Sequence, residues 1–195
     1  KALSFLPLCH IFERTAIYFY MSVGTSVYYA ESLDTIVDNL KEVKPDFFIT
    51  VPRLLEKVYE KIIVTGRGLT GLKKSIFFWA VNIGLDFDDK GNNGSWYNFK
   101  LGIARKLVFS KWQAALGGNV NGIIVGAAAL QVRLGRIFTA AGIPVREGYG
   151  LTESSPVLTD NRFEKGGYQF GTVGKTIPNV ELKIAENGEI LARGP

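Results

Sequence analysis

The stretch FFITV, residues 47–51, decides the fold, and Pro52 follows it directly. A short, continuous run of aromatic and β-branched residues is typical of a strand buried on both faces of a parallel sheet. Pro52 suits the first turn of a helix, because a backbone N–H has no partner there in any case. Apolar residues then recur at helical spacing as far as Gly66. The sequence therefore predicts a strand that leads straight into a helix.

The same alternation occurs twice before this stretch. Residues 4–8 and 26–30 are short apolar runs that likewise predict strands buried on both faces. Residues 12–23 and 34–43 are long enough for the helices that cross between parallel strands. Repeated strand–helix units predict an α/β fold with a mostly parallel sheet flanked by helices.

The second half of the chain continues this pattern and then changes. We predict mostly helix over residues 69–116, interrupted by a polar loop between Asp86 and Asn98, and we assign residues 1–165 to one α/β layer. Over residues 166–195, short strands between Gly, Pro and Asn turns predict the first strands of a small antiparallel β-barrel, cut short by the chain end. Further strands are expected at residues 121–125 and 145–149, a helix at 130–141, and the barrel strands at 171–174, 180–184 and 189–192.

Composition excludes several classes of protein. With 195 residues, 47% hydrophobic and 21% charged, the sequence is that of a folded globular chain. The charge-free residues 15–30 are too few to span a bilayer. Single cysteine and histidine residues, Cys9 and His10, exclude an intrachain disulfide and a zinc cluster. We therefore expect a reducing, cytoplasmic location.

The net charge of +5 comes from basic residues interspersed with acidic ones, as in RLLEKVYEK. Such a pattern is typical of a solvated surface, and no basic and aromatic module indicates nucleic acid as a partner. Weak peripheral contact with an anionic membrane surface stays open. The start at Lys1 and the end in a predicted strand suggest an excised piece, whose unpaired strand edges should make it self-associate.

One segment carries candidate chemistry. Residues 146–156 read REGYGLTESSP, at the carboxyl end of a predicted strand, where open α/β sheets bind ligands. Tyr149 offers a ring face for a base, Thr152 a hydroxyl for phosphate, and Glu153 a carboxylate suited to magnesium. An ordinary turn with a helix cap at Thr152 is the alternative. A glycine pattern at residues 66–71 follows a helix, not a strand, and so does not predict dinucleotide binding.

GYGLTESSP resembles the signature of the adenylate-forming enzymes. Two further blocks match in the expected order, LPLCHIFER at residues 6–14 and VGAAAL at residues 125–130, and the first is similar to the long-chain acyl-CoA synthetase branch. GTVGKTIPNVELKI and GEILARGP resemble the entry of that family into its small barrel. The resemblance implies an ATP-dependent long-chain fatty acid acyl-CoA ligase, which forms acyl-AMP and pyrophosphate and then transfers the acyl group to coenzyme A.

The resemblance also implies roles for individual residues. Tyr149 would stack on adenine, Thr152 would contact phosphate, and Glu153 would bind Mg²⁺, with Thr152 and Glu153 as the catalytic pair. The nucleotide-binding set it implies is Gly126, Ala127, Ala128, Glu147, Gly148, Tyr149, Gly150, Leu151 and Thr152. The acid-binding set it implies is His10, Gly126, Gly148, Pro156 and Val157.

The expected substrates are a fatty acid, ATP and coenzyme A. The phosphate loop, the ribose-binding aspartate and the C-terminal catalytic lysine of that family have no counterpart in this sequence, so the chain alone is expected to be inactive. Two alternatives stay open: a ligase of the same fold that acts on an aryl or amino acid, and a non-catalytic nucleotide-binding protein on the same scaffold.

Overall fold

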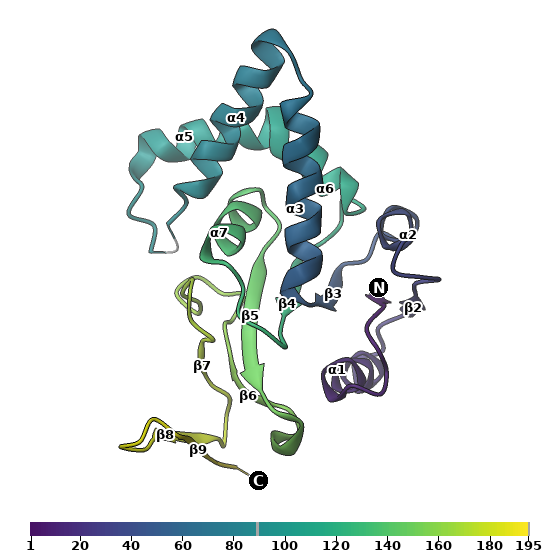
Figure 1. Cartoon of the computed structure of the whole chain (residues 1–195), viewed down its shortest axis with the longest axis vertical. Coiled ribbons are helices and arrows are strands. Elements are labelled where there is room, and N and C mark those ends of the chain that lie inside the picture. Colours follow the sequence, from purple (N-terminus) through teal and green to yellow (C-terminus); the bar gives the residue numbers. More distant parts are fainter. Residues whose placement is uncertain (89, 195) are drawn as a thin grey trace.

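The computed structural model describes residues 1–88 and 90–194. Asp89, in the predicted polar loop, and Pro195, at the end of the predicted barrel segment, lie outside the described residues. Within the described part, a seven-stranded sheet has the order β2-β1-β3-β4-β5-β6-β7, and β8 and β9 form a separate pair (Figure 1).

Five neighbouring strands of the large sheet are parallel, as the strand–helix repeats predict. Their order across the sheet is 2-1-3-4-5, and the register of β3 on β4 places Phe47 opposite Gly122. The strands are β1 (Ala2–Ser4), β2 (Val27–Tyr29), β3 (Phe47–Thr50), β4 (Gly122–Val125) and β5 (Val145–Gly150). The mostly parallel sheet is confirmed.

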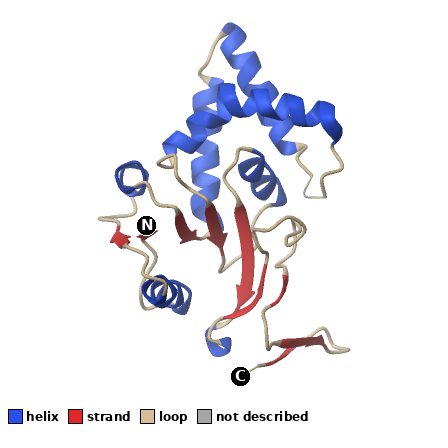
Figure 2. Ribbon diagram, turned by 180° about the vertical axis from the view of Figure 1, so that it is seen from behind, coloured by secondary structure: helices blue, strands red, loops and turns tan. Residues whose placement is uncertain are grey.

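Helices connect these strands, and the helices between β3 and β4 extend beyond one end of the sheet (Figure 2). Pro52 is at the first helical position of α3, as predicted. The first turn of α5 occupies residues 94–98, which we had predicted as loop. The helices are α1 (Ile11–Ser22), α2 (Ile36–Val43), α3 (Pro52–Arg67), α4 (Gly71–Leu85), α5 (Gly94–Ala104), the π-helix η1 (Arg105–Phe109), α6 (Ser110–Ala115), α7 (Val132–Ala140) and the 3₁₀ helix η2 (Thr152–Ser154).

The two faces of the sheet pack against different helices. Ala2 on β1 packs with Ile17 and Tyr20 of α1, whereas Leu3, one residue later, belongs to the larger core under α2, α3, α4 and α7. This alternation follows from the two-residue repeat of a strand. The predicted burial of residues 26–30 is wrong: Tyr28 and Tyr29 are 41% and 59% exposed, because β2 is the outermost strand of the described sheet.

The C-terminal part is antiparallel. β6 (Val157–Asp160) pairs with β5, and β7 (Lys175–Thr176) with β6, while β8 (Glu181–Ile184) and β9 (Ile190–Arg193) form a hairpin. The strand predicted at residues 171–174 is wrong. Gly171 and Gly174 have φ angles of 77° and 85°, which turn the backbone there.

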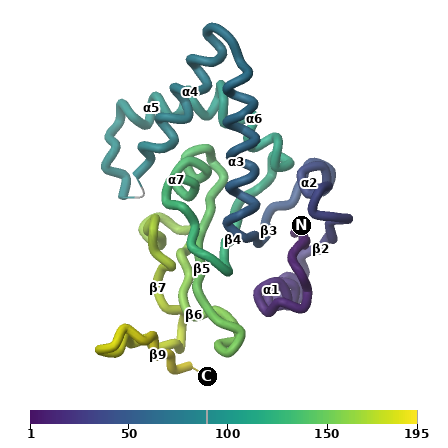
Figure 3. Tube along the Cα trace, in the orientation of Figure 1, coloured from purple at the N-terminus to yellow at the C-terminus, as the bar shows by residue number. Residues whose placement is uncertain are grey.

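The boundary that we placed between residues 165 and 166 stays a prediction about domains. Strand β7 lies beyond it and still belongs to the large sheet. Figure 3 shows the β8–β9 hairpin at the opposite end of the molecule from α4 and α5.

Candidate functional site

The candidate site lies at the carboxyl ends of the parallel strands. From β1 the chain passes to β2 on one side and returns to β3 on the other, so the direction of winding reverses beside β1. Open α/β sheets bind ligands at such a reversal, outside the carboxyl ends of the strands. The loops that follow β1, β4 and β5 all leave this edge, and the residues singled out from the sequence lie on these loops, on the last residues of β5 and at the start of β6.

His10 follows β1 and begins α1. Its side chain is exposed, and Nδ1 accepts a hydrogen bond of 3.2 Å from the backbone N–H of Phe12. His10 therefore caps the helix, which is a structural role that the sequence did not reveal.

Gly126 directly follows β4 and is buried against α1. A Cβ atom there would lie 2.9 Å from the ring of Phe12, so the α1 and β4 loops are in contact. The N–H of Gly126 donates to the carbonyl of Thr50, at 3.2 Å, which joins the end of β3 to the same point. Ala127 and Ala128 are exposed, and Ala127 has a φ of 69°, in the left-handed region.

Glu147 closes the other end of this loop. Its carboxylate accepts a hydrogen bond of 2.8 Å from the N–H of Leu130, and its own carbonyl accepts from the N–H of Asn161 at 2.9 Å. Burial raises the pKa of Glu147, and the bond from Leu130 acts in the opposite direction. The carboxylate that we had placed among nucleotide-binding groups is thus bonded to the chain itself.

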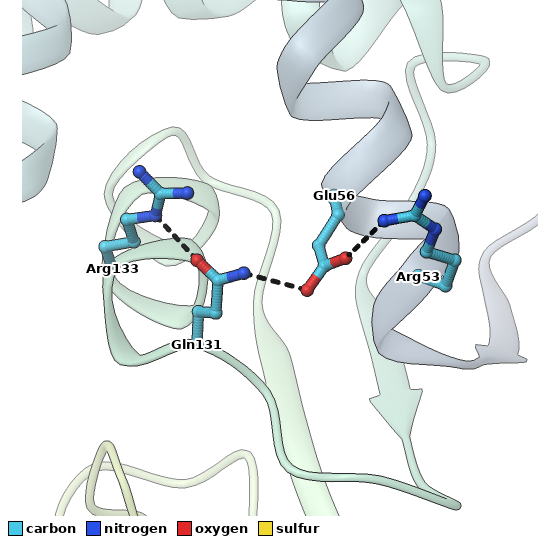
Figure 4. Close-up of polar contacts among 4 residues, drawn as sticks. All are labelled: Arg53, Glu56, Gln131 and Arg133. Atoms are coloured by element: carbon cyan, nitrogen blue, oxygen red, sulfur yellow. Dashed lines mark hydrogen bonds and ion pairs between the residues drawn. The ribbon is translucent and has the colours of Figure 1, made fainter.

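A second set of hydrogen bonds, between side chains of α3 and residues at the start of α7, holds the beginning of α7 in place (Figure 4). The Nε2 of Gln131 donates to Glu56 on α3 at 2.8 Å, and Gln131 accepts from the Nε of Arg133 at 2.8 Å. Arg53 donates to the second oxygen of Glu56 at 3.3 Å. Residues 126–131 are therefore fixed at both ends by groups from other elements.

Tyr149 lies on β5, opposite Thr159 of β6, and is partly exposed. No partner ring is found for it in residues 1–88 and 90–194. The flanking glycines are needed by the fold: a Cβ at Gly150 would lie 1.7 Å from the carbonyl oxygen of Pro156, and one at Gly148 would lie 3.3 Å from that of Thr159. The chain therefore brings backbone close to backbone on both sides of the tyrosine.

The tip of this segment is a short turn. The hydroxyl of Ser154 accepts from the N–H of Leu151 at 2.9 Å and donates to the carbonyl of Pro156 at 2.5 Å. Leu151, not Thr152, occupies the cap position of the 3₁₀ helix, which does not support the alternative of a cap at Thr152. Thr152 and Glu153 are both exposed there. Pro156 is buried, and Val157 begins β6.

Several residues that build this arrangement were missed in the sequence. They are Phe12, Thr50, Glu56, Gln131 and Asn161. Their partners lie far along the chain, Glu56 and Gln131 being 75 residues apart, and no local pattern encodes such a contact.

An open α/β sheet with a winding reversal of this kind is the architecture of many nucleotide- and cofactor-binding domains. Comparison with known protein families identifies the class more narrowly, because the AMP-binding enzyme family matches residues 1–195. The chain belongs to this family.

Named relatives agree with this assignment. Long-chain-fatty-acid--CoA ligase FadD15 of Mycobacterium bovis is 34% identical over 197 residues, covering 100% of this chain and 32% of the relative. Human long-chain-fatty-acid--CoA ligase ACSBG2 is 38% identical over 181 residues, covering 89% of this chain and 27% of the relative. The chain thus spans about a third of the length of the curated relatives it matches.

Solved structures share the fold. A long-chain-fatty-acid-CoA ligase (FadD1) from Archaeoglobus fulgidus has a TM-score of 0.62 at 16% identity, with 99% of this chain and 34% of that chain covered. o-Succinylbenzoate CoA synthetase (MenE) from Bacillus subtilis, in complex with the acyl-adenylate intermediate OSB-AMP, has a TM-score of 0.60 at 16% identity, with 99% and 32% covered.

Proposed function

We propose that this chain supplies the adenine- and metal-binding part of an ATP-dependent long-chain fatty acid acyl-CoA ligase. One observation carries the proposal. At the carboxyl edge, the segment after β4 is hydrogen-bonded to Thr50 of β3 and to Glu147 of β5 and packs against α1 at Gly126. Beside it, Tyr149 at the end of β5 is partly exposed, and Thr152 and Glu153 in the turn that follows are exposed. A site built for a ligand fixes its backbone in advance and leaves the binding groups free.

The nucleotide would lie between the loop after β4 and the end of β5. Tyr149 stacks on the base, since its ring faces no other ring in the described chain, and the backbone of residues 126–128 forms the opposite wall. Thr152 donates its exposed hydroxyl to a phosphate oxygen. Glu147, Gly148, Gly150 and Leu151 serve this site through the backbone geometry that they impose.

The acid would enter from the α1 side. His10 is exposed at the start of α1, and Gly126 meets α1 at Phe12. Gly148, Pro156 and Val157 continue this wall along β5 and β6. A carboxylate is already a nucleophile, so the reaction needs no general base from the chain.

Magnesium fits the residues present. Groups of three or more His, Cys, Asp or Glu side chains that could hold a metal are absent from the described part of the chain. Mg²⁺ is commonly bound by one or two carboxylates together with substrate phosphates and water, so exposed Glu153 with a triphosphate suffices. Bound Mg²⁺ would neutralise charge that develops on the departing pyrophosphate.

The first test uses the chain itself. Calorimetry with ATP and Mg²⁺ should show binding that Tyr149→Ala weakens about tenfold, in line with the loss of one stacked base. Tyr18→Ala, which removes an exposed ring from α1, is the matched control and should leave binding unchanged. Equal affinities in all three proteins would contradict the base-stacking role.

The second test concerns catalysis and requires a polypeptide of the relatives' length. We would replace the matching segment of the M. bovis ligase by this chain and introduce Glu153→Gln. Fatty-acid-dependent pyrophosphate exchange should fall roughly tenfold to a thousandfold, or about 1.4 to 4 kcal/mol of barrier. Thioester formation from supplied acyl-AMP should fall far less.

Glu186→Gln, an exposed carboxylate between β8 and β9, is the control and should leave both rates unchanged. Equal losses in both half-reactions, insensitive to magnesium, would remove Glu153 from the metal site.

A further inference from the structure

Charge is distributed unevenly along this chain. From Lys90 to Arg146 the sequence contains no Asp or Glu, so the chain outside this segment carries a net negative charge although the whole chain carries +5. The basic residues of the segment are Lys90, Lys100, Arg105, Lys106, Lys111, Arg133, Arg136 and Arg146. Four of these eight residues, Lys100, Arg105, Lys106 and Lys111, lie on the continuous helix formed by α5, η1 and α6.

The outer face of this helix is apolar. Trp96 and Phe99 are 70% and 59% exposed, and their rings stack at 5.6 Å with an angle of 19° between planes. Ile103 and Leu107 continue the line at 37% and 48% exposure. We call these four residues the α5 stripe. Their spacing of three or four residues puts them on one side of the helix.

The opposite face already anchors the helix to the core. Tyr97, Leu101, Ala104 and Val108 are buried, and the Tyr97 hydroxyl donates to the carbonyl of Ile83 on α4 at 2.6 Å. The α5 stripe is therefore not needed to hold the helix in place. A large apolar surface that the fold does not use is typical of a binding surface.

Lysines border the stripe along its length. Lys100 lies four residues after Trp96, Lys106 three after Ile103, and Lys111 four after Leu107, so each is a neighbour on the helix surface. Ion pairs involving these lysines are absent from the described residues. Acidic side chains that could neutralise them do not occur on this helix.

We infer that the α5 stripe and its three lysines dock on the surface of an anionic phospholipid bilayer. Aromatic residues, tryptophan above all, favour the boundary between headgroups and acyl chains, and lysine side chains reach outward to lipid phosphates. A helix with an apolar stripe bordered by basic residues lies in the plane of the interface. An acidic protein partner would match the lysines but gives no reason for stacked, exposed rings at the end of the stripe.

The helix would lie on the membrane without crossing it. Among the described helices, none is both long enough and apolar enough to span a bilayer. Figure 2 shows β3, β4 and β5 pointing away from the layer that contains α5, so the docking surface and the candidate site lie at opposite ends of the sheet. Docking thus leaves the site open, and its test does not depend on the proposed reaction.

The experiment measures binding of the 195-residue chain to vesicles. Sedimentation with phosphatidylcholine vesicles containing about one-third phosphatidylglycerol should show binding that weakens with added salt, and pure phosphatidylcholine should bind far less. Trp96 is the exposed one of three tryptophans, so its fluorescence should shift to the blue on binding. Trp96→Ser with Phe99→Ser should lower the partition coefficient at least tenfold.

Matched variants distinguish binding through the α5 stripe from non-specific hydrophobic or electrostatic adsorption to the vesicles. Tyr18→Ser with Phe19→Ser removes two rings of similar exposure from α1 and should leave binding unchanged. Lys100→Gln with Lys106→Gln should weaken anionic binding about tenfold or more, whereas Lys57→Gln with Lys61→Gln on α3 should not. Circular dichroism would show that each variant keeps the helical content of the parent.

Three outcomes would overturn the inference. The first is equal vesicle binding by the parent and the Trp96→Ser, Phe99→Ser variant. The second is equal loss in the α1 control. The third is the absence of vesicle binding by the parent. If in that case the parent is a dimer and the Trp96→Ser, Phe99→Ser variant is a monomer, the stripe forms a contact between copies of this chain.

Discussion

Ala127 adopts a backbone conformation that suits glycine. Its φ of 69° lies in the left-handed region, which costs a residue with a Cβ atom about 1 to 2 kcal/mol. The loop holds it there because Gly126 and Leu130, on either side, are hydrogen-bonded to other elements. Strain of this kind persists only where the surroundings impose it, and it is common at ligand sites.

Ala127→Gly should therefore raise the free energy of unfolding. The relief of strain is partly offset by the greater freedom of glycine in the unfolded chain, so we expect a gain of roughly 0.5 to 1 kcal/mol in urea denaturation. Ala129→Gly is the control, because Ala129 is exposed and has no positive φ. It should lower stability by a similar amount, and a loss in Ala127→Gly would contradict our account of the loop.

At the scale of the element, α1 carries a buried acid. Glu13 is 1% exposed, and its Oε1 accepts a hydrogen bond from Ser4 on β1. Its Oε2 and the hydroxyl of Tyr20 lack a hydrogen-bond partner within the described residues. Burial raises the pKa of Glu13, and burial together with the charge of Glu13 raises the pKa of Tyr20. The helix is thus attached to the sheet through a group that resists ionisation.

This predicts a pH dependence. Because the folded-state pKa is above the ordinary value of 4.5, protonated Glu13 contributes stability that is complete below that value and is lost as pH rises through the folded-state pKa. Glu13→Gln should raise the free energy of unfolding at pH 7 by roughly 1 kcal/mol and change it little at pH 4. Exposed Glu42→Gln should show neither effect. A larger effect at pH 4 than at pH 7 would refute the prediction.

Most of the elements were predictable from sequence, but the strand predicted at residues 4–8 is wrong except at Ser4, because β1 is Ala2–Ser4. β3 and α3 follow from an apolar run and a proline, because burial on both strand faces and a free first turn leave local signatures. The exposure of β2 was not predictable, since its apolar run resembles that of a central strand and only the strand order makes it an edge. The turn at residues 171–174 was missed because its glycines flank residues that also suit a strand.

At the scale of the whole molecule, unpaired edges should govern association. β2 ends the described sheet with exposed Tyr28 and Tyr29, and the neighbouring helix α1 exposes Tyr18, Phe19 and Met21. An apolar edge strand readily pairs with another chain. Sedimentation velocity should show self-association of the parent, and Tyr29→Lys should reduce it. Val64→Lys, at an exposed position of α3, should leave the self-association unchanged. A monomeric parent at every concentration would contradict this.

The candidate site was predictable only in part, because some of its features are local in sequence and others depend on the packed sheet. The sequence places Gly126, Tyr149, Thr152 and Glu153 at strand ends, and parallel strands bring those ends to one edge. The bonds that fix the loops, such as Glu147 to Leu130, join residues 17 positions apart and depend on how neighbouring strands are aligned. Strand alignment is a property of the packed sheet, and so these bonds appear only in the structure.

The bond between Leu130 and Glu147 makes the loop observable by nuclear magnetic resonance. The amide proton of Leu130 is held by a carboxylate, so its chemical shift should follow the ionisation of Glu147 in a pH titration. Its exchange with deuterium requires the loop to detach from β5, since the acceptor is a side chain of that strand. One backbone proton thus reports both the charge beside the site and the rate at which its wall opens.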